Sequence, residues 1–459
     1  MARFLRTTTL PVSPEEAFAW HERPGAFERL LPPWQEIRIL ARQGTIAPGG
    51  RLSLAIRKGP LWLRWEAEHG EWERGRFFTD RLIRGPFPRW EHHHGFLPSE
   101  GGGCLLEDRL DYDLPLGALG AILAGRFLRR DLGRLFAYRH ERTRRDLARH
   151  AAFRNRPPLR VAVTGASGLI GSALVPFLTT GGHAVLRLGR RPSREEGEGR
   201  FDPAAGELDR HLLEDLDAVV HLAGENIAAG RWSPERKEAI RKSRVEGTAL
   251  LAEALASLRR PPRAFLCASA VGYYGHRPEE EVTEESGAGE GFLAEVCREW
   301  EAAAEPARRA GIRVVHLRTG VVLSRRGGAL ARMLPAFRAG AGGPVGSGRQ
   351  GFPWIALDDL IGLVHFLLFE EKVEGPVNAV APEAVSQAHF ARVLGKVLHR
   401  PAFLPLPAPA VRLLFGEMGQ SLLLEGARVR PVRAQAAGFS YQSPSLEEAL
   451  RWELGLVEE

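Results

Sequence analysis

Three glycines, Gly165, Gly168 and Gly171, have the spacing that points most directly to a chemical role. They lie in the segment VAVTGASGLIGSALVPFL, residues 161–178, between a short β-branched run and a helical pattern. A glycine motif in that context predicts a dinucleotide site. Gly165 would permit the tight turn, Gly168 would let the backbone approach a pyrophosphate, and Gly171 would let the helix pack closely on the sheet. The first N–H groups of the helix would then face the phosphates. The alternative is a glycine-rich turn that binds nothing.

The second strand of the same pattern indicates which nicotinamide cofactor the site prefers. It is predicted within HAVLRLGRRPS, residues 183–193, and ends in Gly189, Arg190 and Arg191. A site for NAD usually carries an acidic residue here that binds the ribose hydroxyls, whereas arginine forks bind phosphate. We therefore predict NADP(H) in preference to NAD(H), against the alternative that both arginines are ordinary surface residues. The predicted cofactor-binding residues are Gly165, Ser167, Gly168, Leu169, Ile170, Gly171, Arg190, Arg191, Leu222, Ala223 and Gly224.

Alternating strand and helix patterns surround the glycine motif and predict the fold that positions it. Short apolar runs at 216–225, 264–275 and 312–324 are separated by helical patterns. This is the arrangement of a doubly wound parallel Rossmann sheet of the α/β class. Such sheets bind ligands at the carboxyl ends of their strands. We assign residues 159–459 to this domain and expect a C-terminal substrate or lid subdomain from about residue 375.

Residues 1–150 follow a different pattern. A strand at 7–12 and a helix capped by Ser13 precede several runs that alternate apolar and polar residues. A long helical pattern at about 118–149 ends the segment. This order predicts an α+β domain in which a curved antiparallel sheet grips one helix and could enclose an apolar pocket. Residues 151–158, rich in proline and arginine, would form the linker.

Composition limits the expected location and partners. The formal net charge is +7 and 44% of the residues are hydrophobic, which is a globular balance. The arginine-rich segment 125–150 carries apolar residues at helical spacing. We therefore interpret its charges as a solvated helix face and predict neither nucleic-acid nor membrane binding. Cys104, Cys267 and Cys297 lie too far apart for a disulfide framework or a zinc motif. With no secretory signal evident, these features predict the cytoplasm.

Several longer segments resemble the extended or atypical branch of the short-chain dehydrogenase/reductase superfamily. TGASGLIG matches its cofactor motif. A narrower resemblance, to an NAD-dependent epimerase-like family, rests on LAGENIAAGRWSPERKEAIRKSRVEGT, ASAVGYYG and GGALARMLPAFRAGAGGPVGSGRQGFPWIALDDL, within a match from about residue 160 to 455. Residues 3–149 resemble the helix-grip fold of the START/polyketide-cyclase-like superfamily, whose cavity holds hydrophobic small molecules. The resemblance thus implies a Rossmann enzyme domain fused to an apolar-ligand domain.

The chain departs from that superfamily at the residues that would perform catalysis. The superfamily's acid/base tyrosine and its lysine fall on Leu293 and Cys297, with Glu301 one turn later. Neither residue can take part in a proton relay. The superfamily's serine falls on Ala270 or, with a shift of one, on Ser269. The substitutes available are Ser269, Tyr273 and Tyr274 as catalytic candidates, and Glu225, Arg244, Arg318, Arg349 and Gln350 as substrate-binding candidates.

The HHH run at 92–94 raises the question of a metal site. On a strand, His92 and His94 point to one face and His93 to the other. Two ligands with no third partner evident in the sequence do not make a site. We therefore predict no bound metal and interpret the run as a polar cavity wall or a solvated face.

Taken together, these patterns favour an NADP(H)-binding oxidoreductase or epimerase-like enzyme. It would act on a small carbonyl or hydroxyl substrate and carry a fused domain for an apolar ligand. Two alternatives stay open. The missing Tyr–Lys pair favours a non-catalytic protein that senses NADP(H) or a bound ligand. The third interpretation is a carrier of lipids or other small ligands.

Overall fold

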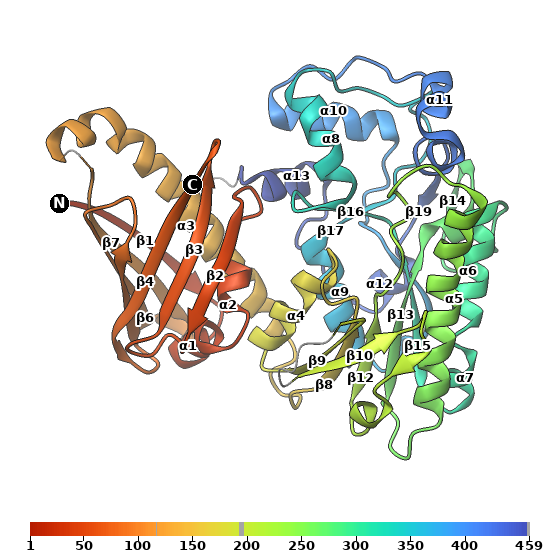
Figure 1. Ribbon diagram of the computed structural model, residues 1–459, viewed down its shortest axis with the longest axis horizontal. Helices are drawn as coiled ribbons and strands as arrows, with labels where there is room; N and C mark the ends of the chain where they lie inside the picture. The colour runs from red at the N-terminus through yellow and green to blue at the C-terminus, as the bar shows by residue number, and fades with distance from the viewer. Residues whose placement is uncertain (116, 192–196, 457–459) are drawn as a thin grey trace. The chain divides into compact units, whose positions relative to one another are not determined.

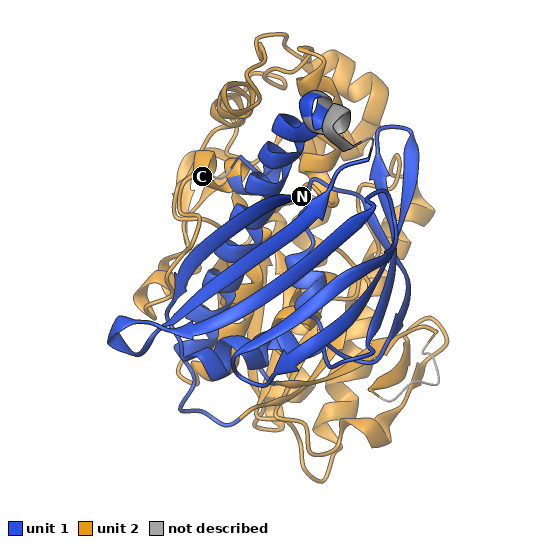
Figure 2. Cartoon of the chain, turned by 90° about the vertical axis from the view of Figure 1, so that its left-hand side faces the viewer, with its two compact units in different colours: residues 1–157, 179–182, 452–459 blue, residues 158–178, 183–451 orange. Residues whose placement is uncertain are grey.

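The computed structural model describes residues 1–115, 117–191 and 197–456 (Figure 1). Its contacts divide the chain into two compact units, drawn in different colours in Figure 2. The first comprises residues 1–157 together with 179–182 and the described residues from Trp452 onward, and the rest forms the second. From the sequence, residues 179–182 and the segment from Trp452 onward are instead predicted to belong to the second domain. Trp452 joins the first unit because its ring stacks on Tyr138, with 4.7 Å between the ring centroids.

The first unit is a seven-stranded antiparallel sheet packed against a long helix, in the order β1-β7-β6-β5-β4-β3-β2. Along β7, Cys104–Asp113, buried and half-buried residues alternate without a break, which is the pattern of a sheet with one face on a core. The predicted helix-grip arrangement is therefore confirmed. The other elements of this unit are β1 (Ala2–Leu10), α1 (Pro14–Glu22), α2 (Ala26–Leu30), β2 (Ile37–Gln43), β3 (Arg51–Lys58), β4 (Leu61–Glu73), β5 (Phe77–Arg84), β6 (Arg89–Pro98) and α3 (Gly117–Ala151).

The long helix α3 presents an apolar stripe to this sheet and charges elsewhere. Phe136 and Leu147 are buried, whereas Arg126 and Arg130 are exposed, as expected for an amphipathic helix. One arginine departs from the expected solvated face, because Arg142 is buried and donates hydrogen bonds to a tyrosine hydroxyl. Among the described residues, no helix has the length and apolar character needed to cross a membrane.

The second unit is built on an eight-stranded sheet in the order β11-β10-β9-β8-β12-β13-β15-β18. All neighbouring pairs from β10 to β18 are parallel, and β12 and β8 are buried almost throughout, as in a sheet covered on both faces. The predicted doubly wound Rossmann sheet is confirmed. Its elements are β8 (Arg160–Thr164), α4 (Gly171–Thr180), β9 (Ala184–Gly189), β10 (Glu198–Asp202), β11 (Glu207–Leu208), β12 (Ala218–His221), α5 (Pro234–Ala256), β13 (Ala264–Ala270), α6 (Phe292–Ala302), α7 (Glu305–Arg309), β15 (Arg313–Thr319), α9 (Leu357–Phe369) and β18 (Gly375–Ala379).

Smaller elements of the second unit lie outside this sheet. Strand β18 pairs with β15, so the expected start of a C-terminal subdomain at about residue 375 falls inside the main sheet. The four described strands outside it form two small parallel pairs between segments that are distant in the sequence, β14 with β19 and β16 with β17. The elements outside the main sheet are β14 (Arg277–Val282), β16 (Val321–Leu323), α8 (Gly328–Arg338), β17 (Trp354–Ala356), α10 (Gln387–Leu398), α11 (Ala408–Gly419), β19 (Ala427–Val429), α12 (Val432–Ala436) and α13 (Leu446–Leu454).

Candidate functional site

The glycine motif lies at the topological switch point of the parallel sheet. The chain runs from β8 to β9 on one side and returns to β12 on the other side of β8, which is where doubly wound sheets bind ligands. Gly165 follows β8 with φ +68°, and a Cβ there would lie 2.8 Å from the carbonyl carbon of Leu222. A Cβ at Gly171 would lie 2.3 Å from the carbonyl oxygen of Gly165. Both positions therefore require glycine, because the chain's own backbone approaches closely.

The loop between β8 and α4 is held in a fixed shape by backbone and side-chain hydrogen bonds. The Gly168 N–H donates to the carbonyl oxygen of Gly165 at 3.0 Å, and the helix begins at Gly171. Thr164 Oγ1 accepts hydrogen bonds from the N–H groups of Leu222 and Ala223 at 3.1 and 3.2 Å. The predicted cofactor-binding residues after β8 and after β12 are thus brought together, with the amino end of α4 at the loop.

A buried histidine contacts the threonine that joins the ends of β8 and β12. His221, the last residue of β12, is fully buried, and its Nδ1 lies 2.7 Å from Thr164 Oγ1. Burial lowers the pKa of His221 to about 4. The ring is therefore neutral at neutral pH, and it holds the threonine that organises the loop.

Arg190 and Arg191 stand directly after β9, the strand beside β8. Both side chains are exposed, and neither forms a hydrogen bond or an ion pair with any described residue. Two exposed guanidinium groups that are unpaired within the described part of the chain are available to an anion such as a phosphate.

A second cluster gathers at the carboxyl end of β13 around one carboxylate. Glu301, on α6, accepts a hydrogen bond from Ser269 Oγ at 2.7 Å. It also accepts two from the guanidinium of Arg318, each at 2.8 Å. The side chains of Arg318 and Glu301 are only 4% and 13% exposed. Burial opposes the charge of Arg318, but the paired carboxylate outweighs burial and raises the pKa of the guanidinium.

The two candidate tyrosines occupy different environments in the short 3-10 turn Val271–Tyr274. Tyr274 is fully buried, and its hydroxyl donates to Asn378 Oδ1 at 2.7 Å and accepts from Arg318 at 3.1 Å. Burial raises its pKa. Tyr273 is half-buried, and its ring centroid lies 3.5 Å from the Arg318 guanidinium carbon. The Tyr273 hydroxyl forms no hydrogen bond with any described residue, so only this tyrosine has an uncommitted hydroxyl.

The positions at which the superfamily carries tyrosine and lysine do lie beside this cluster. A Cβ placed on Gly272 would lie 3.2 Å from the Cβ of Leu293 and 3.9 Å from Cys297 Sγ. Burial raises the pKa of Cys297 to about 11, so its thiol is not a nucleophile at neutral pH. All three cysteines of the chain are free and buried.

Arg244, on α5, places a further cation at the same end of the parallel strands. A Cβ on Gly224 would lie 3.5 Å from its guanidinium carbon, and its Nη2 donates to the carbonyl oxygen of Glu225 at 3.0 Å. Burial lowers its pKa. Arg244 and Gly224, predicted for substrate and cofactor respectively, are therefore neighbours.

The remaining predicted substrate residues belong to other contacts. Gln350 is buried, and its side-chain Nε2 donates to the carbonyl oxygens of Val345 and Leu423 at 3.0 and 2.7 Å, so the amide holds two loops together. Arg349 is exposed. The Glu225 carboxylate is 42% exposed and lies 3.5 Å from Arg236. The structure does not bring these three side chains into the Glu301 cluster.

Some residues of these clusters were not among the site residues predicted from the sequence. Glu301 appears there only as the residue one turn after Cys297, yet it is the acceptor that joins Ser269 to Arg318. Asn378 escaped notice, although a polar residue inside the apolar run GPVNAVA is a detectable signal. The same signal, a polar side chain in a buried strand, marks His221.

In the first unit, the structure corrects the interpretation of the HHH run. His92 and His94 share a face of β6 as expected, while His93 stacks on Phe77. The third partner that the sequence did not reveal is Asp80, which lies opposite His92 in the register of β5 with β6. Its carboxylate lies 3.3 Å from His92 and 3.4 Å from His94. Strand pairing supplied this residue, and pairing is not visible in a local pattern.

Comparison with known families covers both units. Residues 161–380 match the model of the NAD dependent epimerase/dehydratase family. Residues 10–137 match the model described as polyketide cyclase / dehydrase and lipid transport, and residues 406–453 match a domain of unknown function, DUF1731.

Individual relatives extend this result. An epimerase family protein of Mycobacterium bovis is 44% identical over 290 residues, covering 63% of this chain and 96% of that protein. The crystal structure of a nucleoside-diphosphate sugar epimerase from Corynebacterium glutamicum aligns with 99% of this chain and 90% of its own, at 34% identity and a TM-score of 0.80. A crystal structure of a human epimerase family protein with NADPH covers 65% of this chain and all of its own, at 39% identity and a TM-score of 0.60. The glycine motif, the parallel sheet and these identities establish that the chain belongs to the NAD dependent epimerase/dehydratase family, with a polyketide-cyclase-type domain at its N-terminal end.

Proposed function

We propose that the second unit is an NADP(H)-dependent oxidoreductase or epimerase-like enzyme acting on a small carbonyl or hydroxyl substrate. The observation that carries the cofactor choice is the exposed pair Arg190 and Arg191 directly after β9, next to the glycine loop. An adenosine 2′-phosphate is the anion that distinguishes NADP from NAD at this place in the fold. The human relative, whose crystal structure contains NADPH, supports the same choice.

The residues present fit such a cofactor. The loop from Gly165 to Gly171 would hold the pyrophosphate, since its glycines leave the backbone uncovered and α4 begins at its end. The backbone of Leu222 to Gly224 would lie along the next part of the cofactor. When bound, the nicotinamide supplies hydride transfer, and the protein must then supply the proton.

We infer that Tyr273 is the proton donor and acceptor for the substrate oxygen. Its hydroxyl is uncommitted among the described residues, and the Arg318 guanidinium packs over its ring, 3.5 Å from the ring centroid. Arg318 thus supplies a cation beside the tyrosine in a chain that has Cys297 at the position of the superfamily's lysine. Glu301 is a positioning residue, because it holds Arg318 through two hydrogen bonds. Ser269 donates to Glu301 and has the same positioning role.

A second candidate function is a non-catalytic sensor of NADP(H). Leu293 and Cys297 favour it, because neither transfers a proton where the superfamily places its Tyr–Lys pair. For the first unit, the match to a lipid-transport family supports a small hydrophobic ligand. We infer a cytoplasmic location from the three free cysteines, although a relative from Arabidopsis thaliana is named chloroplastic.

Titration of the purified protein with NADPH and with NADH tests the proposal. We expect NADPH to bind more tightly, and Arg190→Ala combined with Arg191→Ala to weaken NADPH binding about tenfold or more, or about 1.4 kcal/mol. NADH binding should change little. A control that removes the same charge is Arg259→Ala combined with Arg260→Ala. These residues lie in the loop before β13, at the amino ends of the parallel strands.

Equal affinities for the two cofactors, or equal losses in the two double variants, would contradict the assignment of the arginines. Turnover then separates the two candidate functions. Consumption of NADPH with any member of a carbonyl panel supports the enzyme, whereas tight NADPH binding without consumption supports the sensor.

A further inference from the structure

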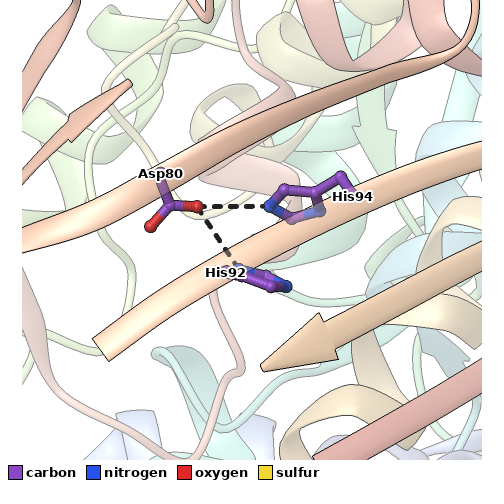
Figure 3. Close-up of side chains that lie close together, drawn as sticks. All are labelled: Asp80, His92 and His94. Carbon is purple, nitrogen blue, oxygen red and sulfur yellow. Dashed lines mark ion pairs between the residues drawn. The ribbon is translucent and has the colours of Figure 1, made fainter. Parts of the chain in front are cut away.

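We propose that the first unit binds one divalent transition-metal cation, of the Zn²⁺ class, through Asp80, His92 and His94 (Figure 3). The three candidate ligand atoms lie within 4.8 Å of one another. Two imidazoles and one carboxylate are a donor set that zinc and similar ions prefer. The match of this unit to a polyketide-cyclase and lipid-transport family assigns no metal to it.

The sheet itself brings the three ligands together. β5 and β6 are neighbours, and Asp80 lies opposite His92 in their antiparallel register. His94 is two residues further along β6 and so lies on the same face. Figure 3 shows the carboxylate of Asp80 directed from one strand toward both rings on the next. The side chains of His92, His94 and Asp80 are 5%, 12% and 16% exposed, so regular strands hold the ligands on a largely dry face.

The distances fit a metal better than they fit direct hydrogen bonds. Asp80 Oδ2 lies 3.3 Å from His92 Nδ1 and 3.4 Å from His94 Nε2. In a tetrahedral site with bonds of about 2.0–2.1 Å, neighbouring ligand atoms are about 3.3 Å apart. His92 also forms a shorter side-chain hydrogen bond with Asp108, at 3.1 Å. A cation between the three atoms would account for this spacing.

A second carboxylate holds the rings in the orientation that a metal requires. Asp108, on β7, lies 3.1 Å from His92 Nε2 and 2.6 Å from His94 Nδ1. Its other oxygen is 2.7 Å from Nε2 of His140, a residue of α3. Metal-binding histidines characteristically donate their second ring N–H to a carboxylate. With the His92 Nε2 proton donated to Asp108, His92 Nδ1 presents a lone pair toward Asp80.

The negative charges of this cluster also favour a bound cation. Asp80 and Asp108 place two carboxylates in a poorly solvated interior, where each charge needs compensation. One divalent cation between the three ligand atoms would compensate the charge of both carboxylates. Three protein ligands leave one coordination position open for water or for an oxygen donor of a small ligand.

Metal analysis of the full chain, prepared without a histidine tag, tests the proposal. The protein is stripped with a chelator, incubated with Zn²⁺, freed of unbound metal and measured for zinc content by elemental analysis. We expect one zinc per chain for the wild type and for His93→Gln. This control changes a histidine of the same strand on the opposite face. We expect Asp80→Asn and His94→Gln to lose the zinc.

Co²⁺ substitution keeps the test decisive if a variant fails to fold. Wild-type protein loaded with Co²⁺ should show the visible d–d absorption of a low-coordinate site with histidine ligands. The proposal is overturned if the wild type retains no zinc and shows no such band, or if folded Asp80→Asn binds as much zinc as the wild type. NADPH titration of the same samples reports on the second unit, so a failure here is separate from a failure of the proposed cofactor site.

Discussion

Replacing Glu301 by glutamine removes the negative charge on which Ser269 and Arg318 converge. Arg318 loses the carboxylate that accepts two hydrogen bonds of 2.8 Å. A glutamine would accept through one oxygen and turn its NH2 group toward another donor. Breaking a buried ion pair by removing one partner costs about 3–5 kcal/mol. Because Glu301 is 13% exposed and the hydroxyl of Tyr274 still contacts Arg318, we expect the lower end, about 3 kcal/mol.

Thermal unfolding followed by circular dichroism measures this loss. For a domain of this size, about 3 kcal/mol corresponds to a decrease in Tm of about 6–12 °C. The matched control is Glu305→Gln on α7, whose carboxylate pairs with Arg308 and Arg309 at 2.7 and 3.0 Å at the surface. Exposed ion pairs contribute little, so this Tm should hardly move. Glu301→Gln combined with Arg318→Met should recover part of the loss, because no uncompensated charge remains.

An equal Tm shift for Glu301→Gln and Glu305→Gln would contradict this expectation. It would mean that the Arg318 guanidinium does not depend on Glu301. The positioning role proposed for the carboxylate, and with it the cation held over Tyr273, would then have no basis.

Three further outcomes follow from the site. Gly171→Ala should abolish NADPH binding in a titration, since its Cβ would lie 2.3 Å from a carbonyl oxygen, whereas Gly230→Ala, with nothing within 4 Å, should bind normally. Burial lowers the pKa of His221 from 6.5 to about 4 in the folded protein. As the pH falls, the histidine of the unfolded chain therefore binds a proton before the histidine of the folded protein does. Urea unfolding should therefore show stability falling between pH 6.5 and 4, by up to roughly 3 kcal/mol; a folded His221→Asn variant with the same slope would exclude this residue as the source. Tyr273→Phe should lower NADPH turnover at least tenfold at unchanged Tm, while Tyr274→Phe should lower Tm by losing a buried hydrogen bond of about 1 kcal/mol; the reverse pattern would exchange their roles.

The parts of the fold that were predictable depend on local physics. The positive φ of Gly165 and the close approach of Gly171 to the Gly165 carbonyl are limits set within a few residues of chain. The cap at Ser13 likewise needs only the next turn, where its hydroxyl accepts from the Glu16 N–H. Strand and helix periods of 2 and 3.6 residues separate an antiparallel sheet with one long helix from a parallel doubly wound sheet. The order of elements, the two sheet types and the switch-point loop could therefore be predicted.

The identity of side-chain partners could not be predicted, because partners meet through pairing between distant segments. Glu301, Ser269 and Arg318 come from a helix and two strands, and only the parallel register of β13 with β15 sets the last two side by side. The two tyrosines at 273 and 274 are adjacent in sequence, and their burial alone separates a committed hydroxyl from an uncommitted one.

The histidine run shows the same division. That His92 and His94 share a face follows from the residue spacing, because a strand alternates its side chains every residue. That Asp80 lies opposite His92 depends on the folded sheet, because the register between β5 and β6 is set by the whole sheet and its core. Local geometry can be predicted from the spacing of residues, whereas contacts between charged or reactive side chains form only when separate strands are aligned.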